Sequence, residues 1–175
     1  MARNHFMVPS APSGDRVTAR FGASAAAYTY KEVGKAVKLA AESQFSLCAA
    51  GDPIEGFVSS VEQGTQNQFT IAGVHIPETG EMVLATADGL QATAGTGTIA
   101  VGDYVVAGTA TASGTALTAY QKVTKATMQP GVTEAAAVGD VNDMLKVMMY
   151  PYRVVSVAAF GGTGAVGDTI VLMRV

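Results

Sequence analysis

The chain has 175 residues, of which 49% are hydrophobic and only 14% are charged, with a formal net charge of -3. This length suits one body with an appendage, and the single cysteine, Cys48, excludes an internal disulfide and a cysteine-based metal site. No apolar run approaches the roughly 20 residues of a membrane span, and no secretory signal is visible. We therefore expect a soluble protein made in a reducing cytoplasm.

Residues 1–30 lack sustained periodicity and are interrupted by prolines and glycines, which is typical of an extended arm. The first 40 residues carry six basic and two acidic side chains, so a basic leader precedes an acidic remainder. Because these cations are scattered singly, an acidic protein partner is favoured over nucleic acid. We predict that the arm binds a partner surface through its basic and apolar anchors: Arg3, Phe6, Arg16, Arg20, Phe21, Tyr28 and Tyr30.

Residues 31–175 alternate short β-prone runs with glycine turns, which predicts a mainly β body, a small barrel or sandwich of about ten strands. The expected strands cover residues 36–39, 45–49, 54–61, 68–76, 82–87, 98–100, 104–110, 116–123, 153–158 and 169–175. The run 33–41 also has apolar residues at helical spacing. Gly34 inside it, and the alternation of polar and apolar residues that follows, favour a strand.

One short helix is predicted from Asp140 to Met149, because Asp140 can cap it and Pro151 ends it. Its apolar residues on one face are Val141, Met144, Leu145 and Met148. We expect this methionine-rich face to pack on the β body, with an adaptable partner-binding face as the alternative.

A short motif recurs along the body, in which a Gly-Asp pair precedes an apolar run. It occurs at Gly102-Asp103 and Gly167-Asp168, with a looser copy at Gly51-Asp52. We predict turns in which glycine adopts a positive φ, aspartate accepts hydrogen bonds from nearby amides, and the branched residues then enter a sheet.

The sequence contains few motifs typical of catalytic, cofactor or metal sites. Residues 162–167 match G-x-G-x-x-G, but no helix follows to receive a phosphate. His5 and His75 stand apart from other metal ligands, Cys48 has no histidine nearby in sequence, and no serine lies in a G-x-S-x-G elbow. We expect no enzyme activity, no cofactor and no metal centre, while a calcium site built from loop carboxylates stays open.

Aromatic and basic residues gather where the predicted helix meets the next strand. Tyrosine and arginine are favoured anchors of protein interfaces. We predict an oligomer interface here, with simple packing of the corner as the alternative: Tyr150, Tyr152 and Arg153.

Two runs, residues 30–39 (YKEVGKAVKL) and 49–58 (AAGDPIEGFV), resemble the capsid decoration, or cement, proteins of tailed bacteriophages. In that family a strand of the form G-x-x-V-x-L leads through a hairpin to D-x-P-I-x-G-V. The resemblance implies a structural virion protein that binds the outer surface of the assembled capsid and cements neighbouring major capsid subunits. It also implies a homo-oligomer, with a trimer favoured over a dimer. From the acidic body and the lack of a membrane span we expect contact with neither nucleic acid nor a membrane. The arm, residues 1–30, would then grip the capsid.

Two other classes of function stay open. A carbohydrate-binding or adhesive β-module of a virion or cell surface is the first alternative, although such sites often stack sugars on tryptophan, and the chain has none. A small β-barrel hydrolase that uses His75 or His5 is the second, and it lacks a supporting motif.

Overall fold

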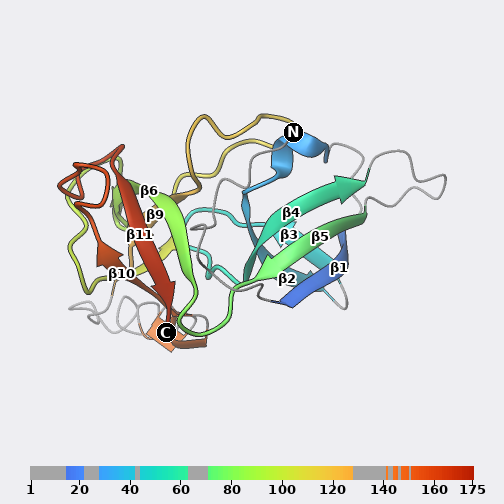
Figure 1. Ribbon diagram of the computed structural model, residues 1–175, viewed down its shortest axis with the longest axis horizontal. Helices are drawn as coiled ribbons and strands as arrows, with labels where there is room; N and C mark the ends of the chain where they lie inside the picture. The colour runs from blue at the N-terminus through green and yellow to red at the C-terminus, as the bar shows by residue number, and fades with distance from the viewer. Residues whose placement is uncertain are drawn as a thin grey trace.

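The computed structural model describes residues 15–21, 28–41, 44–62, 71–127, 151–175 and six helical residues between 141 and 149. Within these ranges the protein is mainly β, as predicted, and contains eleven strands. The strands form two bodies that lie side by side (Figure 1).

The first body is a closed barrel of five strands in the order β1-β3-β2-β4-β5. Its strands and one 3-10 turn are β1 (Asp15–Phe21), η2 (Tyr30–Glu32), β2 (Ala36–Ala41), β3 (Gln44–Leu47), β4 (Gly56–Glu62) and β5 (Ile71–Ile76). Only β1 and β3 run parallel, and every other pair is antiparallel. The preference for a strand over a helix in residues 33–41 is thus confirmed from Ala36 onward.

The second body has the strand order β11-β10-β8-β9-β6-β7, and a further pairing of β11 with β6 closes its first five strands into a second barrel. Its strands are β6 (Met82–Leu90), β7 (Thr93–Ala94), β8 (Tyr104–Ala107), β9 (Lys122–Lys125), β10 (Tyr152–Ser156) and β11 (Thr169–Arg174). Here β6 and β9 form the parallel pair, and β7 is a short hairpin partner of β6.

The two barrels share one topology. Leaving out β7, the strands correspond in chain order, so that β1 matches β6, β2 matches β8, β3 matches β9, β4 matches β10 and β5 matches β11. The registers agree as well, as two equivalent pairs show: Ala36↔Phe57 in the first barrel and Tyr104↔Arg153 in the second. The chain is therefore a structural duplication of one five-stranded unit.

A β-bulge marks the same place in both barrels. It lies between Val58 and Ser60 where β4 pairs with β5, and between Val154 and Ser156 where β10 pairs with β11. A bulge leaves one residue unpaired and increases the local twist, which helps a small sheet to close on itself. Its recurrence at one register supports the duplication independently of the strand order.

The predicted Gly-Asp turns are confirmed at all three places. Gly51, Gly102 and Gly167 have φ values of 83, 95 and 95°, where a side chain would be strained. In each turn the aspartate accepts a hydrogen bond from the amide three residues earlier, at 2.7 Å for Asp52 and 2.8 Å for Asp103. For Asp168 the corresponding distance, from the Ala165 amide, is 3.0 Å.

Each of these turns also docks on a strand by two reciprocal backbone bonds. Gly102 N–H donates to Val154 O at 2.8 Å, and Val154 N–H donates to Asp103 O at 2.9 Å. The same two bonds join Gly34-Lys35 to Val58, Gly51-Asp52 to Ala107, Gly80-Glu81 to Arg174, and Gly167-Asp168 to Ala87. One turn design thus recurs five times and starts or bridges strands in both barrels.

The predicted arm, residues 1–30, needs correction. Asp15–Phe21 forms β1, which pairs with β5 from Asp15 to Arg20 and completes the first barrel. The body therefore begins at or before residue 15 rather than at residue 31, and residues 1–14 lie outside the described ranges. Polar and apolar residues do alternate in β1, but over only seven residues, too few to stand out between glycine-rich flanks.

Two predicted strands are largely absent. Of residues 98–100 only Thr98 forms a bridge, to Ala165, and of residues 116–123 only the last two belong to β9. Residues 108–121 instead form a loop that crosses to the first barrel, where the Gln121 side chain accepts the Ala36 amide at 3.0 Å. The β-branched and small residues of this loop therefore contact the first barrel instead of pairing in a sheet.

The barrels are packed together through an apolar junction. Ala36, Cys48 and Phe57 of the first barrel belong to one buried cluster with the core of the second. Phe57 meets Tyr152 edge to face, with ring centroids 6.1 Å apart, a favoured aromatic geometry. The Gly51-Asp52 turn adds its two backbone bonds to Ala107.

Cys48 reports on this junction. It is 6% exposed, and burial raises the pKa of its thiol, so the reactive thiolate is scarce in the folded protein. An aromatic disulfide reagent that releases a yellow product on reaction with a thiol would measure this by absorbance. We expect it to label Cys48 at pH 8 in denaturant, and to react negligibly in native buffer over the same time. Rapid native labelling would show that the two barrels separate readily.

Candidate functional site

The segment that precedes β10 carries an exposed apolar face. Six of its described residues are α-helical, as predicted: Val141, Met144, Leu145, Val147, Met148 and Met149. Val147 is the buried residue, at 2% exposure, and packs with Val106, Ala126 and Tyr104 of the second barrel. The helix is therefore attached through a residue outside the predicted stripe.

The predicted packing of the methionine-rich stripe is wrong. Val141, Leu145 and Met148 are 44, 55 and 67% exposed, and Met149 beside them is 68% exposed. Their spacing of four and three residues places the first three along one side of a helix. Met144, the fourth residue of the predicted stripe, is half-buried. Val141, Leu145, Met148 and Met149 together are called the exposed apolar stripe below.

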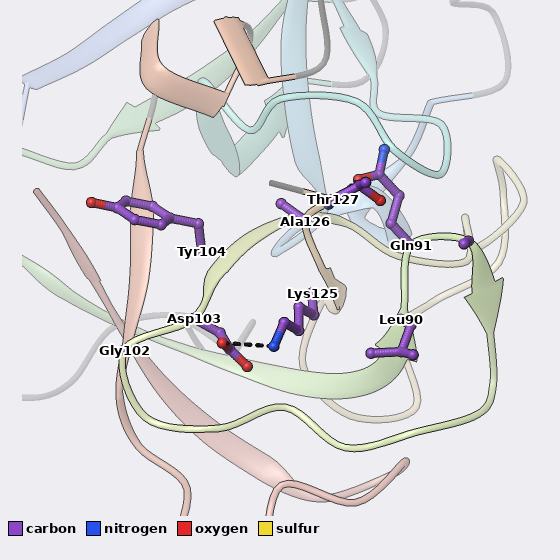
Figure 2. A pocket seen from close by; sticks show the side chains of 9 residues that line it. Leu90, Gln91, Gly102, Asp103, Tyr104, Lys125, Ala126 and Thr127 are labelled. Carbon is purple, nitrogen blue, oxygen red and sulfur yellow. Dashed lines mark hydrogen bonds and ion pairs between the residues drawn. The ribbon is translucent and has the colours of Figure 1, made fainter. Parts of the chain in front are cut away.

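A pocket of about 510 Å³ lies beside the helix on the second barrel. Its lining residues come from the β6–β7 turn, the Gly102-Asp103 turn and the end of β9: Leu90, Gln91, Ala92, Gly102, Asp103, Tyr104, Lys125, Ala126 and Thr127. Tyr104 and Ala126 also contact Val147, so the pocket and the helix share a wall. Figure 2 shows this arrangement.

An ion pair stands in this pocket. Lys125 Nζ lies 3.0 Å from Asp103 Oδ1, and the lysine and aspartate side chains are 43 and 17% exposed. Asp103 Oδ2 accepts the Ala100 amide at 2.8 Å, so one carboxylate oxygen fixes the turn and the other holds the ammonium (Figure 2). Opposite them, Gln91 Oε1 accepts the Thr127 amide at 2.8 Å. The pocket thus offers a charged donor and a charged acceptor between apolar walls.

The predicted partner-binding residues lie partly within the described ranges, and their joint role stays a prediction. Arg3 and Phe6 lie outside the described residues, while Arg16, Arg20 and Phe21 belong to β1 of the first barrel. Tyr28 is partly buried against the first core, and burial raises the pKa of its hydroxyl. Tyr30 is 65% exposed, so its side chain is open to a partner.

The predicted oligomer interface is also divided. Tyr152 is fully buried in the core, where burial raises its pKa, so its side chain is unavailable to another chain. Arg153 is exposed on the opposite face of the same strand and donates from Nε to Gly102 O at 3.0 Å. Tyr150 lies outside the described residues. Strand alternation explains the split, because neighbouring residues point to opposite faces.

His75, considered above as a catalytic residue, joins the two barrels. Its Nε2 lies 2.7 Å from Glu81 Oε1, and both side chains are buried. Glu81 Oε2 accepts the Glu78 amide at 3.1 Å, which fixes the turn before β6. In the part of the chain that the structure describes, no three histidine, cysteine or carboxylate side chains gather as metal ligands. No helix there has the length and apolarity that crossing a membrane requires.

Comparison with known proteins adds no relative. No family model, no curated protein and no solved structure matches this chain.

Sequence reasoning found Asp103 as a turn residue but missed its partner Lys125. The link depends on antiparallel pairing of β8 with β9, which places Lys125 opposite Val105 and beside the turn. A lysine at the end of a short β run gives no signal of its own. The exposed stripe was visible as a methionine-rich helix face, but periodicity does not tell which side of a helix meets the barrel.

Proposed function

We propose that this chain is a structural virion protein that binds the outer surface of an assembled bacteriophage capsid and cements neighbouring coat subunits. The exposed stripe of Val141, Leu145, Met148 and Met149 is the observation that supports this most directly. Contiguous exposed apolar surface on a soluble protein usually marks a contact with another protein. Flexible methionine side chains adapt well to such contacts.

The duplication supports the same role. Two barrels fused through a buried junction form a body with potential contact points on each barrel, such as Tyr30 on the first barrel and the stripe on the second. When one contact has formed, the second becomes intramolecular, so modest individual contacts add up to firm attachment. A body that engages two neighbouring subunits in this way would resist their separation. The resemblance of residues 30–39 and 49–58 to decoration proteins favours a capsid as the partner.

The test is co-sedimentation with capsids of the encoding phage that lack this protein. We expect wild-type protein to sediment with the shells, and a Leu145→Ser, Met148→Ser double variant to bind at least about tenfold more weakly, since two apolar anchors of an interface are lost. Leu39→Ser is the matched control, because Leu39 is 51% exposed but lies on the first barrel. Absence of wild-type binding would refute the function, and full binding by a folded double variant would refute the stripe as the contact.

The predicted gripping arm needs its own variant. Because β1 begins at Asp15, a truncation that tests the arm must end at residue 14. We expect removal of residues 1–14 to weaken shell binding while leaving the unfolding temperature within about 3 °C of wild type, since no described strand is removed. Unchanged binding by this truncated protein would show that residues 1–14 play no part in the contact.

A further inference from the structure

A buried ion pair in the first barrel binds the backbone of a turn from the second barrel. Lys35 and Glu32, 2 and 0% exposed, form a buried pair at 3.3 Å. The second barrel inserts a turn against them, with Ala112 O accepting Lys35 Nζ at 2.9 Å and Gly114 N–H donating to Glu32 Oε1 at 2.6 Å. Thr115 N–H donates to Ala112 O at 3.1 Å and closes the turn. The pair therefore clamps the backbone of a glycine turn.

One wall of the open pocket is formed by the equivalent turn of the second barrel. Gly34-Lys35 docks on Val58, and Gly102-Asp103 docks on Val154, by the same two backbone bonds at the same bulged strand. Asp103 therefore stands where the first barrel has Lys35. Its ammonium partner comes from β9, as Lys125, instead of from the turn.

The two carboxylates are used alike. One oxygen of Glu32 accepts the Thr29 amide three residues earlier, at 2.5 Å, and the other holds the ammonium together with the Gly114 amide. One oxygen of Asp103 accepts the Ala100 amide three residues earlier, and the other holds the Lys125 ammonium. A carboxylate oxygen has two lone-pair sites, so Asp103 Oδ1 can accept a further amide as Glu32 Oε1 does.

We propose that the pocket binds a glycine β-turn of a coat subunit, with Lys125 donating to the carbonyl of the first turn residue and Asp103 accepting the amide of the glycine. The identity of the partner rests on the proposed function, whereas the chemistry of the site does not. A pocket of about 510 Å³ is within the size range of ligand sites. Leu90, Ala92 and Ala126 would flank small side chains like those of the turn held by the first barrel.

Within the described ranges, the glycine turns of this kind already have partners for their amides, so we assign the occupant to another protein. The Gly114 amide is bound by Glu32. The docked turns give their glycine amides to backbone carbonyls of the strands on which they lie, and Gly95 gives its amide to Asp88 O.

Binding can be measured with the full chain and a peptide copy of the turn. The probe is a capped peptide of residues 109–118 (TATASGTALT), titrated into ¹⁵N-labelled protein. We expect saturable shifts at the amides of Gln91, Asp103 and Lys125. A peptide with sarcosine at the glycine, which lacks that N–H, should bind at least about fivefold more weakly, in line with loss of one charge-assisted hydrogen bond.

Protein variants locate the binding. Lys125→Met should weaken peptide binding at least about fivefold, and Asp103→Asn should remove the preference for glycine over sarcosine. Lys31→Met, which removes an exposed cation from the first barrel, should leave binding unchanged. The proposal would be overturned if the shift changes fell on residues outside the pocket, or if wild-type protein bound both peptides with equal affinity.

Competition identifies the source of the turn. Excess peptide should release wild-type protein from capsids, and Lys125→Met protein should bind capsids more weakly. The assignment to a coat subunit is wrong if the peptide binds the pocket but leaves the capsid complex intact. It is also wrong if the peptide instead dissociates an oligomer of this chain. If wild-type protein ignores capsids altogether, the proposed function fails, while peptide binding still reports separately on the pocket.

Discussion

Replacing Glu32 with glutamine should lower the free energy of unfolding by about 3–5 kcal/mol at pH 7, because it leaves the Lys35 ammonium buried without its counter-charge. Glutamine keeps the size of the side chain and an oxygen that can accept the Thr29 or Gly114 amide. The loss therefore combines the missing charge with one amide hydrogen bond, because glutamine has a single acceptor oxygen. Urea denaturation followed by circular dichroism would measure it.

The sign of the pH dependence follows from the pKa of Lys35. Burial lowers this pKa, and Glu32 partly offsets the effect. Without Glu32 the folded-state pKa falls further below the unfolded value of about 10.4, so the unfolded chain binds more protons. Stability must then rise with pH up to that value. The deficit of Glu32→Gln should shrink between pH 7 and pH 10, and a deficit that stays constant would contradict this account.

A partly exposed ion pair supplies the control. Lys38 Nζ and Asp52 Oδ2 are 2.7 Å apart, but their side chains are 33 and 20% exposed. Solvent screens such a pair, so Asp52→Asn should cost less than about 1 kcal/mol, with no comparable recovery at high pH. Equal losses in Glu32→Gln and Asp52→Asn would show that burial does not set the cost.

The buried pair matters because of what it joins. In wild-type protein, burial by itself raises the pKa of Glu32, but the amides of Thr29 and Gly114 and the Lys35 ammonium outweigh it and leave this pKa lowered. Two of these three partners belong to the first barrel, and Gly114 belongs to the loop from the second. The charge receives all three partners only when both barrels are in place, which couples their folding.

The mainly β fold and the Gly-Asp turns followed from local sequence. A glycine that must adopt a positive φ, followed by an aspartate that caps its own turn, needs only four residues, and three such motifs were recognised. The same design at Gly34-Lys35 and Gly80-Glu81 was missed because lysine or glutamate replaces aspartate. Glu81 nevertheless accepts the Glu78 amide in the same way.

The duplication could not be read from the sequence. Equivalent core residues have changed type, as Ala72 to Ile170, and the spacing between equivalents grows along the chain, from Ala19 and Ala85 to Val74 and Leu172. The growth comes from long insertions between strands of the second barrel. One of them, residues 108–121, contains most of the predicted strand 116–123, yet its backbone groups at Ala112 and Gly114 are bound by the first barrel.

The same reasoning explains the candidate site. Aromatic and basic residues near 150 were selected for their interface preferences, but Tyr152 is needed to fill the junction against Phe57. Lys125 and Asp103 meet only through the pairing of strands. Residues that bind through tertiary geometry carry no local signature. The trimer predicted from the resemblance stays a prediction.

Gly164 is the second position where a single substitution should have a large effect. Gly164→Ala should lower the free energy of unfolding by about 3–5 kcal/mol, because two costs combine. Its φ of 83° is unfavourable for alanine, and the added Cβ would collide with the Ile99 carbonyl. The collision threatens the bond from Ile99 N–H to Gly164 O, 2.9 Å long, which ties the β10–β11 loop to the segment before β8.

Gly167→Ala separates the two costs. Gly167 lies in the same loop with a φ of 95°, but a Cβ there would meet no atom within 4 Å. Its amide bond to Ala87 O is compatible with alanine, so only the backbone conformation is penalised, by about 1–2 kcal/mol. Urea denaturation of both variants should therefore show the larger loss in Gly164→Ala. If the two losses are equal, the Ile99 segment moves away without cost, and the loop is not held against the second barrel as the bridge from Thr98 to Ala165 implies.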